Sequence, residues 1–198
     1  MRVEVAAVLL VLLSLGFNVP FWDEPPGRDQ GIFLAEAAMM LDGAALYVDV
    51  WENKPPGVLL LYAAALGTFG RTYGVIQVLD WLAGLITALG LMWLVRHATG
   101  RTGLGVAAGA LYLAYAGGVL FGGFWVTGQP EVFMDPLIVG ALLLLRSREE
   151  ATARSRLGVL GAGALAGLAV VLKYSALPLL ALGLLHPFRQ ERGLKPRL

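Results

Sequence analysis

The chain of 198 residues is 58% hydrophobic, carries 15 basic and 14 acidic side chains, and has a mean hydropathy of +0.71. Soluble globular domains are about half apolar and about a quarter charged, so this composition excludes a water-soluble enzyme. The formal net charge of +1 excludes a nucleic-acid binder, which needs a basic surface, and the lack of cysteine excludes disulfide frameworks and thiolate zinc sites.

Apolar stretches near the length needed to cross a bilayer of about 30 Å recur along the chain. We expect an all-α polytopic membrane protein with about six transmembrane helices. The expected crossings are 3–19, 75–95, 104–121, 132–145, 157–172 and 176–188. The fourth is short unless it begins near Gly122. The last two are also short and are predicted to form one hairpin that turns at Lys173, Tyr174 and Ser175.

Basic residues indicate the orientation, because cytoplasmic loops near membrane helices carry an excess of Lys and Arg. With the N-terminus inside, eleven basic residues fall in inner segments and four in outer segments, namely Arg28, Lys54, Arg71 and Lys173. We therefore expect a multi-pass protein of the cell membrane with a cytoplasmic N-terminus and a cytoplasmic tail, 189–198. The first apolar segment lacks a small-x-small cleavage site before Pro20, which predicts a retained helix rather than a secretory signal.

The predicted first outer loop, 20–74, differs from its apolar surroundings because it holds seven acidic and three basic residues. We expect two short helices in it, both lying along the outer membrane interface. The first is 30–41, with Asp29 at its N-cap and Asp42-Gly43 closing its other end. The second is 58–69, which follows Pro55-Pro56 and is too short to span a bilayer.

Further carboxylates lie toward the outer ends of the expected crossings, at Asp80, Glu131 and Asp135. An ionisable side chain within a membrane segment costs at least a few kcal/mol, so it usually faces the bundle interior or a water-filled cavity. Cations are expected at about the same depth, from Lys54, Arg71 and Lys173. A cavity with carboxylates and cations suits an anionic lipid head group whose neighbouring carbon is attacked by an acceptor that a carboxylate activates.

Four motifs follow one another along the chain: RDQGIFLAEA at 28–37, NKPPG at 53–57, QPE at 129–131 and LKYS at 172–175. Between the first two lie Gly43, Tyr47 and Asp49, and Phe69-Gly70 follows them. In this order they resemble family 39 glycosyltransferases, which are membrane-embedded enzymes of the GT-C fold. That family is related to protein O-mannosyltransferases and to the aminoarabinose transferase of lipid A. The resemblance covers nearly the whole chain.

The resemblance implies a transferase that takes a sugar from a polyprenyl-phosphate donor on the outer leaflet and gives it to a lipid, glycan or protein acceptor. It implies that Asp29 is, or lies near, the catalytic base and that Glu131 is the second acidic position. It also implies that Lys54 lies near the donor phosphate, where Lys173 is a second candidate. Gln30 stands where the family usually has Glu, which removes a second carboxylate from the site.

Gln30, Glu36 and Asp135 are candidate supporting residues of this site. Simpler roles compete with the catalytic ones, since Asp29 suits a helix cap and Lys54 suits an interfacial anchor that extends toward water.

Other roles are also left open. Asp80 could pair with a basic group on another helix, and Lys173 could extend toward water from the hairpin turn. A divalent cation between Asp29 and Glu131 is conceivable. Both histidines, His97 and His186, fall on the predicted cytoplasmic side, so a histidine-based metal site on the outer side is not supported.

Members of the family carry further membrane helices after the sixth, and often an outer domain. We therefore expect residues 1–198 to be a single transmembrane module, the N-terminal part of a longer architecture that a C-terminal half or a partner subunit completes. The competing hypothesis is a non-catalytic polytopic protein, either a transporter fragment or a subunit of a lipid-linked-sugar pathway. Such a protein should tolerate single neutral substitutions of its carboxylates, whereas the enzyme should not.

Overall fold

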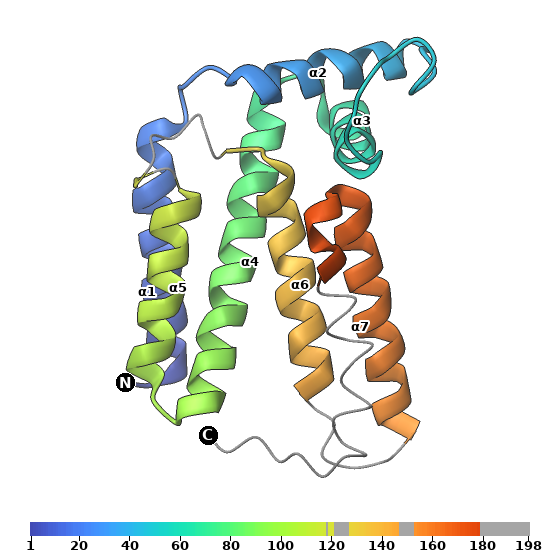
Figure 1. The fold of residues 1–198 in the computed structure, drawn as a ribbon. Helices are drawn as coiled ribbons and strands as arrows, with labels where there is room; N and C mark the ends of the chain where they lie inside the picture. The colour runs from blue at the N-terminus through green and yellow to red at the C-terminus, as the bar shows by residue number, and fades with distance from the viewer. Residues whose placement is uncertain (118, 121–126, 147–152, 179–198) are drawn as a thin grey trace.

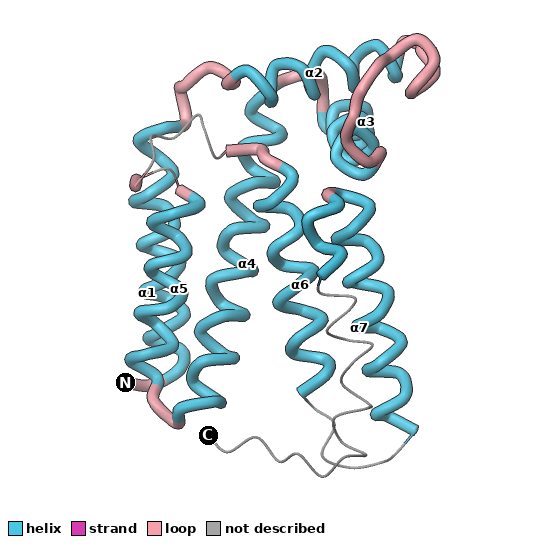
Figure 2. The backbone as a smooth tube through the Cα atoms, in the orientation of Figure 1, coloured by secondary structure: helices cyan, strands magenta, loops and turns pink. Residues whose placement is uncertain are grey.

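The structure is a computed structural model of the 198-residue chain, and it describes residues 1–117, 119–120, 127–146 and 153–178. Regular structure in these residues is helical, which confirms the predicted all-α class (Figure 2). The α-helices are α1 (Val3–Asn18), α2 (Arg28–Leu41), α3 (Gly57–Phe69), α4 (Tyr73–Thr99), α5 (Thr102–Ala116), α6 (Pro130–Arg146) and α7 (Ala153–Leu172). Short 3-10 turns follow α1 and α7, at Val19–Phe21 and Tyr174–Ala176.

Five of these helices form a bundle, and the other two lie at one end of it (Figure 1). The long helix α4 is central, because it packs against α1 and α5 on one side and against α6 on the other. Helix α7 packs on α6, and α2 lies across the end of the bundle together with α3. The N-terminus lies at the opposite end, so the 20–74 segment and the chain start are separated by the length of the bundle.

Two clusters of buried apolar side chains hold these helices together. The smaller lies between α1, α4 and α5 and is built from Ala6, Leu10, Ala88, Met92 and Leu113. The larger lies where α2 and α3 meet α4, α6 and α7. At its centre, the buried Tyr62 ring makes edge-to-face contacts with Phe33 and Phe133, with ring centroids 5.6 and 6.5 Å apart. Helices α2 and α3 are therefore fixed to the end of the bundle by a shared apolar core.

Glycines let two helix pairs approach at backbone distance. A Cβ atom added at Gly105 of α5 would overlap the carbonyl oxygen of Met92 in α4. The start of α3 meets the end of α7 in the same way, because a Cβ atom at Gly57 would overlap the carbonyl oxygen of Val171. Small residues at helix contacts allow this close packing, which any side chain would prevent.

Among the residues that the structure describes, two of the expected crossings are helices long and apolar enough to span a bilayer. They are Val3–Phe21, with a mean hydropathy of 2.0, and Tyr73–Thr99, with a mean hydropathy of 1.9. Core helices of soluble proteins and signal sequences pass the same test of length and composition, so these two helices are weak evidence of membrane passage and six spans are not shown.

The third, fourth and fifth expected crossings coincide with α5, α6 and α7. The third ends earlier than predicted, because α5 stops at Ala116 with Gly117 as its C-cap. Helix α7 ends at Leu172 and a 3-10 turn follows at Tyr174–Ala176, where the hairpin was expected to turn. Most of the sixth, and the whole tail 189–198, lie outside the described residues.

The glycine contact between α4 and α5 can be tested with a matched pair of substitutions. Gly105→Ala should lower the free energy of unfolding by about 1–3 kcal/mol, because the added methyl group forces the two backbones apart. Gly103→Ala on the same helix meets open space and should raise it by about 0.5–1 kcal/mol. Denaturant-induced unfolding of the purified protein measures both, and equal effects of the two variants would contradict the close approach.

Candidate functional site

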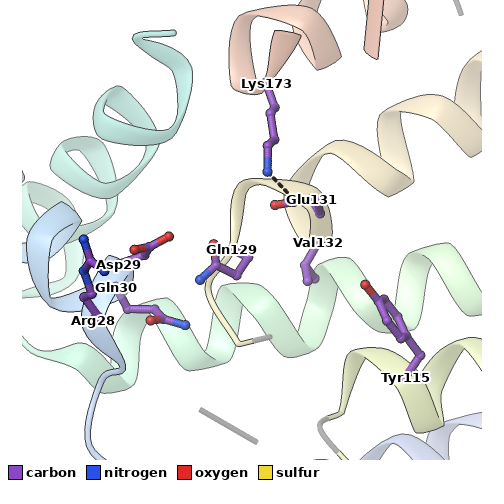
Figure 3. Close-up of a pocket in the computed structure, with 8 residues that line it drawn as sticks. All are labelled: Arg28, Asp29, Gln30, Tyr115, Gln129, Glu131, Val132 and Lys173. Atoms are coloured by element: carbon purple, nitrogen blue, oxygen red, sulfur yellow. Dashed lines mark hydrogen bonds and ion pairs between the residues drawn. The ribbon is translucent and has the colours of Figure 1, made fainter. Parts of the chain in front are cut away.

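An open pocket of about 380 Å³ lies where the starts of α2 and α6 meet the end of α7 (Figure 3). It is lined by Arg28, Asp29, Gln30, Tyr115, Gln129, Glu131, Val132 and Lys173. All of these side chains except Val132 end in a polar or charged group. The volume falls within the range of about 300–1,000 Å³ typical of small-molecule sites. The pocket therefore suits a polar, charged ligand.

Four of the predicted site residues, which come from three separate segments of the chain, line this pocket together: Asp29, Gln30, Glu131 and Lys173. The other three predicted residues are not part of its lining: Glu36, Lys54 and Asp135. Arg28, Gln129 and Tyr115 line the pocket without having been predicted as site residues. Arg28 and Gln129 stand directly beside predicted residues in the motifs, so proximity in sequence was the available signal for these two.

Asp29 is not the helix cap that the sequence pattern predicts. Helix α2 begins at Arg28 and its N-cap is Gly27, whose carbonyl accepts the first helical hydrogen bond from Gly31 at 2.9 Å. The helix starts earlier than predicted because glycine can serve as an N-cap through its backbone alone. Asp29 thus lies in the first turn, where the helix dipole favours a carboxylate. Among the residues that the structure describes, none forms a hydrogen bond or an ion pair with its side chain.

Gln30 is buried, with 1% of its surface exposed, and it donates a hydrogen bond from Nε2 to the carbonyl oxygen of Thr127 at 2.5 Å. An ionised carboxylate at this position could not donate to a carbonyl group. Glutamine therefore suits a structural role here, in which α2 holds the segment that precedes α6.

Side chains of two further helices, α3 and α4, form hydrogen bonds with the backbone of Gly128. Its N–H donates to Oδ1 of Asp80 in α4 at 2.6 Å, and its carbonyl accepts from the Tyr62 hydroxyl of α3 at 2.7 Å. Its φ of +69° lies in the left-handed region that favours glycine, and an added Cβ atom would meet the Tyr62 hydroxyl. Asp80, which is 2% exposed, is thus paired with a backbone amide rather than with the basic group considered from the sequence.

Glu131 and Lys173 come together from neighbouring helices. Glu131 lies in the first turn of α6, and Lys173 directly follows the last residue of α7. Lys173 Nζ forms an ion pair with Oε1 of Glu131, and the two side chains are 34% and 39% exposed. Oε2 of Glu131 is buried and has no hydrogen-bond partner in the described part of the chain. Within the described part of the chain, the pocket therefore contains one carboxylate with a partner, Glu131, and one without, Asp29.

Lys54 belongs to a second group of charges, which we call the Lys54 group: Glu36, Glu52 and Lys54. Lys54 Nζ lies 3.5 Å from Oε2 of Glu52 and 4.7 Å from the centroid of the Phe33 ring. The Glu52 side chain is only 7% exposed. Lys54 is therefore occupied by a carboxylate and an aromatic face, an arrangement that stabilises a cation without any ligand.

Asp135 joins α6 to α5, because its Oδ2 accepts a hydrogen bond from the Tyr112 hydroxyl at 2.8 Å. This contact gives it a structural partner outside the pocket lining. Over the described residues, no group of three or more His, Asp or Glu side chains is arranged to hold a metal ion. Nothing there adds a third ligand to Asp29 and Glu131 for the divalent cation considered from the sequence.

Comparison of the chain with family models, with curated proteins and with solved structures finds no match in any of the three. The family 39 resemblance thus stays a prediction from the motifs. Function is inferred from the pocket and from the motifs that meet there.

The hydrogen bond between Tyr62 and Gly128 should contribute measurably to stability. Tyr62→Phe should lower the free energy of unfolding by about 1–2 kcal/mol, because the Gly128 carbonyl then loses its buried donor. Tyr47→Phe is the control, since its exposed hydroxyl donates to the Lys54 carbonyl at 2.8 Å and water can replace it. Denaturant-induced unfolding measures both; a Tyr47→Phe loss as large as that of Tyr62→Phe would contradict the buried role.

The Lys54 group predicts a pH-dependent stability. Burial raises the pKa of Glu36 above 4.5, the nearby Glu52 raises it further, and Lys54 partly counteracts both. Because the unfolded chain loses this proton at a lower pH than the folded chain, ionisation of Glu36 destabilises the fold as pH rises from about 4.5 through the folded value. Glu36→Gln should therefore raise the unfolding midpoint at pH 8, and this gain should shrink toward pH 4.

A series of thermal unfolding curves from pH 4 to pH 8 measures this gain. Glu4→Gln, near the exposed start of α1, is the matched control. A gain from Glu36→Gln that stays constant over the whole range would show that ionisation of Glu36 is not its origin.

Proposed function

We propose that this chain forms part of a membrane glycosyltransferase that resembles family 39, moving a sugar from a polyprenyl-phosphate donor to a lipid, glycan or protein acceptor. The observation that carries the proposal is the meeting of three motifs, 28–37, 129–131 and 172–175, at one polar pocket. Their charged residues supply two carboxylates and two cations to its lining: Asp29, Glu131, Arg28 and Lys173.

Exposed apolar surface supports a membrane location. In the most apolar 18-residue stretch of each long apolar helix, only 17% (Val3–Phe21) and 33% (Tyr73–Thr99) is buried. Large side chains on other helices are equally exposed, including Leu111 at 68%, Leu157 at 71% and Leu160 at 70%. Large apolar side chains exposed in this way are unfavourable in water and favourable in lipid. We therefore keep about six crossings, with both termini cytoplasmic, as part of the proposal.

The pocket end of the bundle is proposed to face the outer side of the membrane. It lies opposite the N-terminus, which the distribution of basic residues places in the cytoplasm (Figure 1). On this side a polyprenyl-phosphate donor presents its head group at the level of α2 and α3. The acceptor then reaches the pocket from outside or from the outer leaflet.

The donor phosphate is proposed to bind near Arg28 and Lys173. Both cations line the pocket, and the starts of α2 and α6 also lie there, so two helix N-termini add positive potential. Arg28 takes the phosphate-binding role that the sequence analysis expected for Lys54, because the Lys54 ammonium group is engaged by Glu52. Positive groups held at the departing phosphate stabilise its growing charge in the transition state.

Asp29 is proposed as the general base. Its carboxylate accepts the proton of the acceptor as the acceptor atom bonds to the sugar carbon, and the bond from that carbon to the phosphate oxygen breaks. The electron pair of this bond leaves with the polyprenyl phosphate. Asp29 suits the role because it lines the pocket and no described residue pairs with it.

A second candidate is a non-catalytic polytopic protein, either a transporter fragment or a subunit of a lipid-linked-sugar pathway. The ion pair between Lys173 and Glu131 favours it, because the two charges satisfy each other without any ligand. In that case Glu131 and Lys173 serve only to join the start of α6 to the end of α7.

Asp29→Asn should lower sugar transfer by about 10²–10⁴-fold, the usual contribution of a general base, and leave the amount of folded protein in the membrane unchanged. Transfer is measured in purified membranes with a panel of short-chain polyprenyl-phosphate sugars. Asp23→Asn is the control, because Asp23 is exposed and lies outside the pocket lining.

Transfer that persists in Asp29→Asn would remove Asp29 from the mechanism. If single neutral substitutions of Asp29, Glu36 and Glu131 all leave the cellular function intact, the non-catalytic candidate is favoured. If the wild type binds donor but transfers nothing, the chain is half of an enzyme that needs its partner.

A further inference from the structure

One of the two cations of the pocket, Lys173, already holds an anion. Lys173 Nζ is paired with Oε1 of Glu131, and both side chains line the same cavity (Figure 3). A phosphate that enters this cavity therefore meets a lysine whose charge is neutralised by the protein itself. Glu131 and the phosphate must compete for one ammonium group.

The ion pair has the features of a contact that can be exchanged. Only one oxygen of Glu131 takes part, since Oε2 has no partner in the described part of the chain. About a third of each side chain is exposed, and ion pairs that remain in contact with water contribute little to stability. Breaking it therefore costs much less than breaking a bidentate, fully buried pair.

Lys173 can change partner without a change in the fold. Its backbone N–H donates to the carbonyl of Ala169 at 3.0 Å, and its own carbonyl accepts from the N–H of Ala176 at 3.2 Å. These two bonds fix its backbone at the end of α7. The four-carbon side chain is flexible, so its ammonium group can swing within the cavity while the helix stays in place.

We infer that Glu131 is an internal competitor of the ligand: phosphate binding is an exchange in which Lys173 leaves Glu131 and pairs with a phosphate oxygen. The inference rests on the proposed function for the identity of the ligand, the phosphate of a polyprenyl carrier. The exchange leaves Glu131 without its lysine partner in the cavity that Asp29 also lines. A second free carboxylate is thus present only while the donor is bound.

Competition of this kind lowers the apparent affinity by the fraction of molecules in which Lys173 is unpaired. Glu131→Gln removes the competitor and should tighten phosphate binding about two- to five-fold, the range that a partly exposed ion pair allows. Lys173→Met removes the shared cation and should weaken binding about ten-fold. In the Lys173→Met background, Glu131→Gln should tighten binding less than in the wild type, because removal of the Glu131 charge then no longer frees a lysine.

The experiment measures dissociation constants in lipid nanodiscs for the wild type, both single variants and the double variant. The probes are a short-chain polyprenyl monophosphate and inorganic phosphate, which distinguish a lipid-linked ligand from a free one. Asp29→Asn, alone and with Lys173→Met, is the matched control, because this pocket carboxylate does not pair with Lys173. It should change affinity by the same factor in both backgrounds. Lys173→Gln replaces Lys173→Met if the latter fails to fold.

If Glu131→Gln tightens phosphate binding equally with and without Lys173, Glu131 acts by its charge alone and the exchange is overturned. In that case, binding of the lipid probe by the wild type would still support the proposed donor. The expected coupling with inorganic phosphate alone would support the exchange and overturn the lipid donor. Binding of neither probe by any variant overturns both.

Discussion

The pocket depends on a short stretch of backbone, residues 127–129, that three other helices hold in place. Asp80 of α4 and Tyr62 of α3 bind the amide and the carbonyl of Gly128, and Gln30 of α2 binds the carbonyl of Thr127. Buried backbone groups outside a helix need partners, and in surroundings of low polarity each unmade bond is costly. The start of α6 is thereby fixed against α2, α3 and α4 together. The pocket exists only when all of these helices are assembled.

This constraint also separates the charges at this end of the bundle. The segment that is held at Gly128 brings Glu131 toward Lys173, and Asp29 lines the same cavity. Lys54 and Glu52 instead pair with each other within the loop that precedes α3. A cation with a buried carboxylate beside it is a poor anchor for an incoming phosphate. The side chains that can respond to a ligand are therefore those around the pocket, whereas Lys54 is already engaged by Glu52.

The positions of most helices could be predicted from the sequence, because runs of apolar residues mark the segments that avoid water. The start of α2 did not, since Gly27 caps the helix without a side chain that a pattern could identify. Four residues of the pocket were predicted from the motifs and their order. The partners of Lys54 and Asp80 could not be predicted. The first is bound by a residue only two positions away, and the second by a backbone amide, which residue types do not reveal.

The contact between Gly57 and the carbonyl of Val171 ties the two halves of the pocket to each other. Val171 lies two residues before Lys173, and Gly57 starts the helix whose Tyr62 holds Gly128. With no side chain between the two backbones, nothing there can repack to absorb a displacement. Helices α3 and α7 are therefore fixed to each other at this point, and the helix that holds Gly128 also holds the backbone that precedes Lys173.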